Sequence, residues 1–388
     1  MLTETLDALL SSVDGIRKHG EQLLIEAEQT DLELGVKLTR ILKDEGGTIA
    51  HRQLCGILLK QYILNHWQNG SPNFRPPEVP DHAKMTIREI LPNCLGDAER
   101  SVRASAAYAV AAVAAFDWPT HWPDLIEALV NAVASCNARL VHGAMHALSD
   151  LAALITERQN ELQSVLERFS QALFPHLLKI LVTHDDTYSV DTRKRGVTVF
   201  HTLAKSIFDN KSACKRTLMP WVASYSEALI VCVEAALTTS SIDFDFVLRI
   251  LQTLSWLWEH FPQIVALSYG ERLVGLLIHL LRRVTEEHLR GLHSTATTDD
   301  DSTSLNSAIV ELCEMTQSLS SQQHFDHWFS SSLVEIIHSA LYLMQITPIK
   351  AEEWIDNVAQ FIEDEDEDGL VDEPRSAARN LLLVGNLC

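Results

Sequence analysis

The sequence predicts an all-α fold built from repeated helix pairs, and three observations support this prediction. Apolar residues recur at spacings of three and four along most of the 388 residues, which is the period of an amphipathic helix. Short breaks that carry Pro, Gly, Asn or Asp separate these segments. Strand patterning is nearly absent, and the β-branched run from Ala228 to Thr238 continues a helical pattern from Trp221, so we expect a buried helix there.

One helical face is repeated along the chain. Four segments that align with one another begin at Val102, Val141, Lys194 and Val247, at spacings of 39, 53 and 53 residues. Their eleventh and fifteenth positions are apolar in every copy, and a second amphipathic helix lies between successive copies. A helix pair that recurs at about 40 to 50 residues is typical of a HEAT-repeat α-α superhelix, or α-solenoid.

Both ends of the chain continue this pattern. Further helices are predicted at residues 15–29, 32–45, 48–67 and 80–95, and the apolar segment 375–388 begins another unit that has no partner. We therefore expect one solenoid of about seven to eight helix pairs over residues 1–388. It is either a truncated or alternatively terminated form of a longer array, or it pairs its open end with another molecule.

Two stretches between the predicted helices are expected to be loops. Residues 68–80 are rich in Pro, Gly and Asn, and residues 294–304 have no apolar face. Since a segment without apolar residues cannot bury enough surface to order itself, we predict that the second loop is flexible.

The chain is strongly acidic. It has 31 Lys and Arg against 52 Asp and Glu, a formal charge of −21, which repels phosphate backbones and attracts basic proteins. We therefore expect no direct nucleic-acid binding. The longest uncharged apolar run, residues 104–116, is too short to span a bilayer, and no secretory signal is evident, so we expect a soluble intracellular protein without membrane insertion. Seven scattered cysteines without a C-x-x-C pair predict reduced thiols.

Three stretches of the sequence resemble one protein family. They are HRQLCGILLKQYILNHW at residues 51–67, SVRASAAYAVAAVAAFDWPTHWPDLIEAL at residues 101–129, and LYLMQITPIKAEEWIDNVAQFIEDEDEDG at residues 341–369. In this order they are similar to the importin-β (karyopherin) family of nuclear transport receptors, and the third resembles the importin-nine branch. Because members of that family are much longer, the resemblance implies their N-terminal third to half.

The resemblance implies a set of partners. Family members engage Ran in its GTP form through an N-terminal region, here residues 14–95, and through the second helix of each early pair. Carried onto this sequence, the candidate Ran-binding residues are Glu33, Lys37, Asp81, Lys84, Arg88, Asp124 and Glu127. The branch takes basic cargo proteins, such as core histones and ribosomal proteins, on its curved inner surface. The family also contacts Phe-Gly repeats of the nuclear pore in outer-face grooves and shuttles between cytoplasm and nucleus.

The residues themselves indicate no catalytic chemistry. The sequence lacks a Gly-rich phosphate loop, a G-x-S-x-G elbow and an H-E-x-x-H pair, so we expect neither an enzyme nor a bound cofactor. His142 and His146 are four residues apart, and His324 and His327 are three apart, which are spacings that can bind a metal. No nearby Cys or carboxylate completes four ligands, so no metal site is predicted.

Two other features have packing explanations. Trp118 and Trp122 stand before prolines at the end of a predicted helix, and their large apolar rings are expected to pack between adjacent helix pairs. The basic run at residues 193–195 is short and isolated, so we expect a solvated helix end.

The most acidic stretch is FIEDEDEDGLVDEP at residues 361–374. It opens like a calcium-binding EF-hand loop, but Arg375 stands at the twelfth position, where a bidentate Glu should close the shell, so no calcium site is predicted. A continued helix would place like charges four residues apart, at a cost of about 0.2–0.5 kcal/mol per pair, so we predict an acidic loop over residues 363–373. It contains the carboxylates of Glu363, Asp364, Glu365, Asp366, Glu367 and Asp368.

The role of this acidic loop and of the whole chain has more than one interpretation. The loop is either a docking site for basic cargo or a surface that only keeps the protein soluble. The chain is either a nuclear import receptor, a HEAT-repeat scaffold that holds proteins together without shuttling, or a truncated form with partial receptor function. A preference for Ran-GTP over Ran-GDP would separate a receptor from a scaffold.

Overall fold

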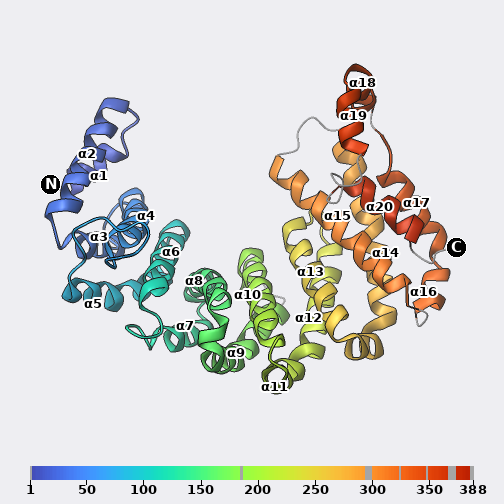
Figure 1. Cartoon of the computed structure of the whole chain (residues 1–388), viewed down its shortest axis with the longest axis horizontal. Coiled ribbons are helices and arrows are strands. Elements are labelled where there is room, and N and C mark those ends of the chain that lie inside the picture. The colour runs from blue at the N-terminus through green and yellow to red at the C-terminus, as the bar shows by residue number, and fades with distance from the viewer. Residues whose placement is uncertain are drawn as a thin grey trace. The chain divides into compact units, whose positions relative to one another are not determined.

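The computed structural model describes residues 2–183, 187–292, 299–322, 325–346, 348–365 and 373–384, and these ranges contain helices but no strand (Figure 1). The chain divides into two compact units, unit 1 from Met1 to Thr217 and unit 2 from Leu218 to Cys388. Each unit is a stack of helix pairs in two layers, so the prediction of an all-α HEAT-type fold is confirmed.

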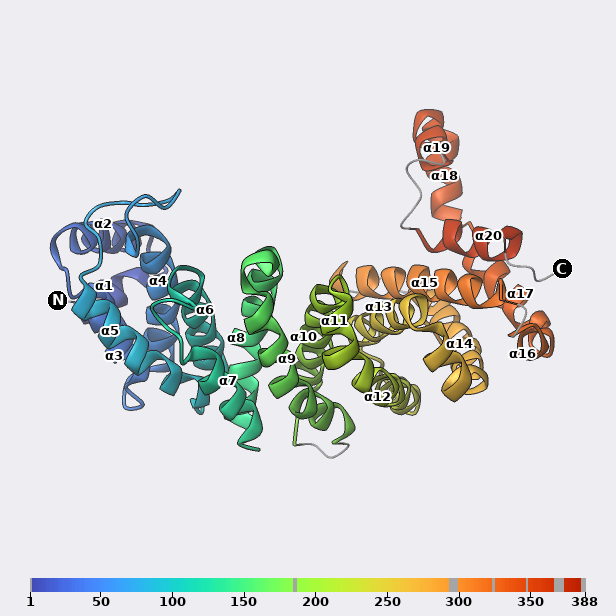
Figure 2. The ribbon, with the colours of Figure 1, turned by 60° about the horizontal axis from the view of Figure 1, so that its bottom comes forward.

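In unit 1, the first helices of successive pairs form one layer. α4 packs against α6, α6 against α8, and α8 against α10, while α3 with α5 and α7 with α9 belong to the other layer (Figure 2). The helices of this unit are α1 (Leu2–Leu9), α2 (Asp14–Thr30), α3 (Leu34–Lys43), α4 (Ile49–His66), α5 (Asp81–Ile90), η1 (Leu91–Gly96), α6 (Arg100–Asp117), α7 (Leu125–Ala134), α8 (Ala138–Glu157), α9 (Gln159–Val182), α10 (Val190–Phe208) and α11 (Lys211–Ala213).

Unit 2 repeats the arrangement. α13 packs against α15 and α15 against α20, while α12, α14 and α17 form the second layer. The helices are η2 (Cys214–Leu218), which leads into this unit, α12 (Met219–Leu237), α13 (Phe244–His260), α14 (Pro262–Leu292), α15 (Asp299–Ser320), α16 (Asp326–Ser330), α17 (Leu333–Leu343), α18 (Pro348–Asp356), α19 (Val358–Glu365) and α20 (Pro374–Val384). The last helix, α20, for which the sequence offers no second helix of its own pair, packs against α15 and α17 of the preceding pair.

The face that is repeated in the sequence forms the core. The eleventh position of every aligned segment is at most 6% exposed, at Ala112, Leu151, Ala204 and Leu257. The fifteenth position is buried at Ile155 and Phe261 and half-buried in the other two copies. Because each apolar face is covered only when the next helix pair packs on it, neighbouring repeats stabilise one another.

An arginine at the fourth position of three helices satisfies the end of the preceding helix. Arg52 of α4 donates from Nε to the Leu42 carbonyl of α3 at 3.2 Å. Arg103 of α6 donates to two carbonyls that follow η1, and Arg193 of α10 donates to the C-cap carbonyl of α9 at 2.6 Å. The last carbonyls of a helix have no partner within it, so these guanidinium groups supply one. The prediction of a solvated helix end was therefore wrong for Arg193.

Two packing predictions are confirmed. Trp118 and Trp122 are 2% and 9% exposed. The β-branched run lies in α12, where Leu229, Ile230 and Val233 are buried. The helical stretch from Lys211 to Leu237 has the length and apolar composition of a membrane span, but half of its most apolar window is buried inside the protein. We interpret it as a core helix.

The predicted loops agree with the structure in part. Residues 67–80 connect α4 to α5 without helix, as expected. The flexible loop predicted over residues 294–304 is wrong in its second half, because α15 begins at Asp299. Residues 293–298 lie outside the described ranges.

The acidic loop predicted over residues 363–373 is wrong for its first three residues. The described part of the chain is helical up to Glu365, because α19 includes residues 363–365. Phe361 of α19 packs edge-on against Trp354 of α18, with ring centroids 5.2 Å apart, which holds the two short helices together. Residues 366–372 lie outside the described ranges.

Candidate functional site

The seven predicted Ran-binding residues lie on the second helices of the first three predicted pairs, or directly before them. We call this surface the α3–α5–α7 face. It comprises Glu33, Lys37, Asp81, Lys84, Arg88, Asp124 and Glu127. α3 packs against α5, so residues about 50 positions apart in the sequence are placed side by side.

Three carboxylates of this face are open to solvent. Asp81 begins α5, Asp124 is the N-cap of α7, and Glu127 lies in the first turn of α7; all three side chains belong to exposed residues. Carboxylates near a helix N-terminus interact favourably with the helix dipole, which explains why these positions tolerate acidic residues. The exposed carboxylates can therefore contact a basic partner surface without first breaking a strong internal contact.

Glu33 and Lys37 are half-exposed and form ion pairs at the edge of the face. Glu33 Oε1 lies 2.5 Å from His82 Nε2 and so links α3 to α5, while Lys37 Nζ lies 2.6 Å from Asp31 Oδ2. The side chains of Glu33 and Lys37 are 44% and 50% exposed. Exposed ion pairs contribute about 0–1 kcal/mol, so a partner can replace them at small cost.

Lys84 and Arg88 serve the fold of this region. Lys84, with a side chain only 12% exposed, donates to Glu78 at 2.7 Å and holds the pKa of that carboxyl below its ordinary value. Arg88 Nη1 lies 2.6 Å from Asp117 Oδ2, with side chains 17% and 7% exposed, and so ties α5 to the end of α6. Of the seven predicted residues, these two are the least available to a partner.

Sequence reasoning missed other polar residues of the same face. Asp31 and His82 make the ion pairs just described, and Glu89 of α5 is exposed. The sequence did contain a signal for these three residues, because each is one or two positions from a predicted site residue. With these residues included, exposed carboxylates dominate the face, which favours a basic surface on the partner.

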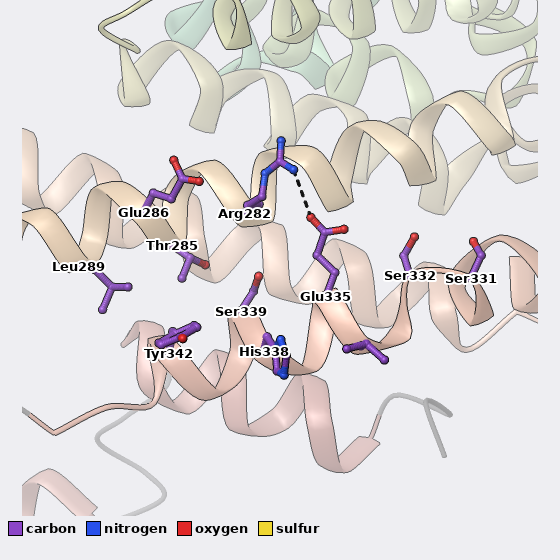
Figure 3. Close-up of a pocket in the computed structure, with 11 residues that line it drawn as sticks. Arg282, Thr285, Glu286, Leu289, Ser331, Ser332, Glu335, His338, Ser339 and Tyr342 are labelled. Atoms are coloured by element: carbon purple, nitrogen blue, oxygen red, sulfur yellow. Dashed lines mark ion pairs between the residues drawn. The ribbon is translucent and has the colours of Figure 1, made fainter.

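A groove in unit 2 lies between α14 and α17 (Figure 3). Its volume is about 500 Å³. Arg282 of α14 faces Glu335 of α17 across it, with Nη1 and Oε1 3.7 Å apart, and Glu286 adds a second carboxylate on the α14 side. Leu289 and Tyr342 form an apolar end. A groove with two carboxylates and an apolar end suits a peptide segment that carries basic and apolar side chains.

The structure also brings a carboxylate to the histidine pair for which sequence reasoning found none. Asp191 of α10 lies 3.3 Å, Oδ2 to Nε2, from His142 of α8. The contact with His142, helped by the charges of Arg195 and Arg100, holds the pKa of Asp191 below its ordinary value. Burial lowers the pKa of His146 to about 4. The sequence gave no hint of this contact, because Asp191 is 45 residues beyond His146 and in the next repeat.

Known proteins are similar to this chain in sequence. The family model described as the importin-beta N-terminal domain matches residues 20–97. Importin-9 of Drosophila melanogaster is 24% identical over 403 residues, an alignment that covers 99% of this chain and 38% of that protein. Importin subunit beta-5 of Schizosaccharomyces pombe is 24% identical over 279 residues, which cover 66% of this chain and 27% of that protein. The chain thus spans well under half the length of these relatives.

Solved structures share the fold. The crystal structure of Kap121p bound to RanGTP superposes with a TM-score of 0.58 at 18% identity and covers 98% of this chain and 32% of that one. The exportin Cse1 in its cargo-free, cytoplasmic state gives a TM-score of 0.62 at 13% identity and covers 98% of this chain and 41% of that one. At these identities the likeness shows a shared helical-repeat architecture.

Proposed function

Because the chain belongs to the importin-β (karyopherin) family, in the importin-9 branch, and corresponds to an N-terminal portion, we propose that it acts in a nuclear import receptor. In this proposal it binds Ran in its GTP form and basic protein cargo, and it shuttles between cytoplasm and nucleus. The observation that carries the proposal is the importin-beta N-terminal domain over residues 20–97, which includes α3 and α5 of the acidic α3–α5–α7 face.

Ran-GTP is proposed to bind at the α3–α5–α7 face. The open carboxylates of Asp81, Asp124 and Glu127 support this, and Kap121p is a structural neighbour that has been solved with RanGTP. Replacing both Asp124 and Glu127 with Lys is expected to weaken Ran-GTP binding by about 10- to 100-fold, because like charges across an interface repel. The affinity is measured by biolayer interferometry with the purified full chain. Asp209→Lys, at the end of α10 in the other layer, is the matched control.

Basic cargo is proposed to bind unit 2 through carboxylates. The groove between α14 and α17 offers Glu286 and Glu335, and the acidic run Glu363–Asp368 follows on α19 and beyond it. Both features suit Lys- and Arg-rich proteins such as histones and ribosomal proteins. The groove lies between second helices of successive pairs, the same kind of helix that carries the α3–α5–α7 face in unit 1.

Replacing residues 363–368 with Ser and Gly is expected to weaken histone-dimer binding and to flatten its dependence on salt. The physical reason is the loss of six carboxylates that attract a basic partner within a Debye length of about 8 Å. Affinity is measured at several salt concentrations with the full chain. A control variant replaces the aspartates at 299–301 with Ser, which removes acidic charge from α15 of the same unit. If affinity and salt slope match the wild type, the acidic run only keeps the protein soluble.

The proposal extends to the nuclear pore. As a family member, the chain is proposed to contact Phe-Gly repeats in grooves between helices of its outer face. A scaffold that does not shuttle would lack this contact. Retention of the purified chain on immobilised Phe-Gly repeats, compared with a Ser-Gly repeat of equal length, therefore tests the shuttling part of the proposal.

A further inference from the structure

Two imidazoles and a carboxylate meet between α8 and α10 of unit 1. His142 and His146 lie one turn apart on α8, and Asp191 is the second residue of α10. Asp191 Oδ2 lies 3.3 Å from His142 Nε2 and 3.8 Å from His146 Nε2, and one ligand atom from each residue lies within 4.8 Å of the others. We propose that these three residues form a binding site for a divalent transition-metal ion, for which Zn²⁺ is the best match.

The distances fit a shared coordination shell. Two ligands of a tetrahedral zinc ion, each about 2.0–2.2 Å from the metal, are about 3.3–3.5 Å apart. His142 Nε2 stands at this distance from Asp191 Oδ2, yet neither ring nitrogen of His142 has a hydrogen-bond partner among the described residues. His146 Nε2 lies 3.8 Å from the same oxygen, slightly beyond this range.

The ligand types select the class of metal. Two imidazole nitrogens and one carboxylate oxygen suit Zn²⁺, Co²⁺ and Ni²⁺, whereas Ca²⁺ and Mg²⁺ require mostly oxygen ligands. Both imidazoles are 6% exposed, so they are held in place by packing. The Asp191 side chain is 27% exposed, which leaves an entry for the ion and for a water molecule as fourth ligand.

Two arginines form ion pairs with the same carboxylate and so compete with a metal ion for it. Arg100 Nη2 lies 3.0 Å and Arg195 Nε 3.6 Å from Asp191 Oδ2. Without metal, Asp191 is therefore the centre of an ion-pair cluster that joins α6 and α10. The Arg100 side chain is 65% exposed and is free to turn into solvent, so Arg100 and the metal compete for one oxygen atom. A bound ion then links α8 directly to α10, two helices of consecutive repeats.

Metal binding is measured on the purified full chain after treatment with a chelator. Titration with Co²⁺ is expected to give one equivalent with the intense visible bands of four- or five-coordinate cobalt, which Zn²⁺ then abolishes. His146→Gln and Asp191→Asn are each expected to weaken binding by about 10- to 100-fold or more. His51→Gln serves as the matched control, because it removes another histidine that contacts a carboxylate, Asp7, at 2.8 Å. Absence of these bands, or their persistence in both ligand variants, would overturn the proposal.

A variant that binds metal more tightly distinguishes a true metal site from loss of binding through damage to the fold. Arg100→Gln is expected to tighten Co²⁺ and Zn²⁺ binding by about tenfold, because it removes the competing cation from Asp191 Oδ2. Loss of folding cannot produce this result. Zinc affinity that is unchanged or weaker in Arg100→Gln contradicts the shared-oxygen geometry.

Discussion

Replacing Arg52 with Met is expected to destabilise unit 1 by about 3–5 kcal/mol, because it leaves the carboxylate of Asp97 buried without its counter-ion. The two side chains form an ion pair between α4 and the loop after η1, and each is only 4% exposed. Arg52 also donates to a carbonyl at the end of α3, so the change removes a helix cap as well.

The free energy of unfolding is measured by urea denaturation, followed by circular dichroism. Arg17→Met is the control, because Arg17 and Asp14 form an ion pair whose side chains are 45% and 58% exposed; its expected effect is below about 1 kcal/mol. The double variant Arg52→Met, Asp97→Leu is expected to recover most of the loss, because it removes both buried charges. An Arg52→Met protein as stable as the control would show that the pair is not buried in solution.

Replacing Gly143 with Ala is expected to destabilise unit 1 by about 3 kcal/mol, the upper end of the usual cost of overpacking. Gly143 lies on α8 where it crosses η1, and a Cβ atom there would stand 2.1 Å from the carbonyl oxygen and 2.8 Å from the carbonyl carbon of Leu95. Backbone atoms cannot rotate away as a side chain can, so the two helical segments must separate. The consequence is a loosened contact between the second and fourth predicted pairs.

Gly275→Ala is the matched control for this change. Gly275 lies within α14 and a Cβ atom there meets nothing within 4 Å, so the same substitution is expected to stabilise unit 2 by about 0.4–1 kcal/mol through the unfolded chain. Thermal unfolding of the unmodified chain and the two variants, followed by circular dichroism, is expected to show a lower melting temperature for Gly143→Ala and a higher one for Gly275→Ala. A neutral result for Gly143→Ala would contradict the close approach of α8 and η1.

The fold was predictable from the sequence because its signal is local. The three-and-four spacing of apolar residues and its repetition from Val102 onward predict the helix pairs, and the aligned positions are the buried ones. The start of α15 at Asp299 and the end of α19 at Glu365 were missed, because a polar, charged run can begin or end a helix as well as form a loop.

The candidate site was only partly predictable, because its decisive contacts are not local. Lys84 and Arg88 are charged and lie at the predicted helical positions, but they form ion pairs with Glu78 and Asp117 within the fold. The pairing of Asp191 with His142 joins residues 49 positions apart across a repeat boundary. Charge and spacing along the sequence identify surfaces, whereas the partner that each side chain selects depends on how neighbouring repeats stack.

The central claim is that the chain belongs to a nuclear import receptor whose N-terminal repeats recognise Ran in its GTP form. It is tested most directly by measuring the affinity of the purified full chain for Ran loaded with GTP and for Ran loaded with GDP under identical conditions. The account predicts binding to the GTP form that is at least about tenfold tighter, and a loss of that preference in the variant with Lys at residues 124 and 127. Equal affinity for the two forms, or no binding to either, would contradict it.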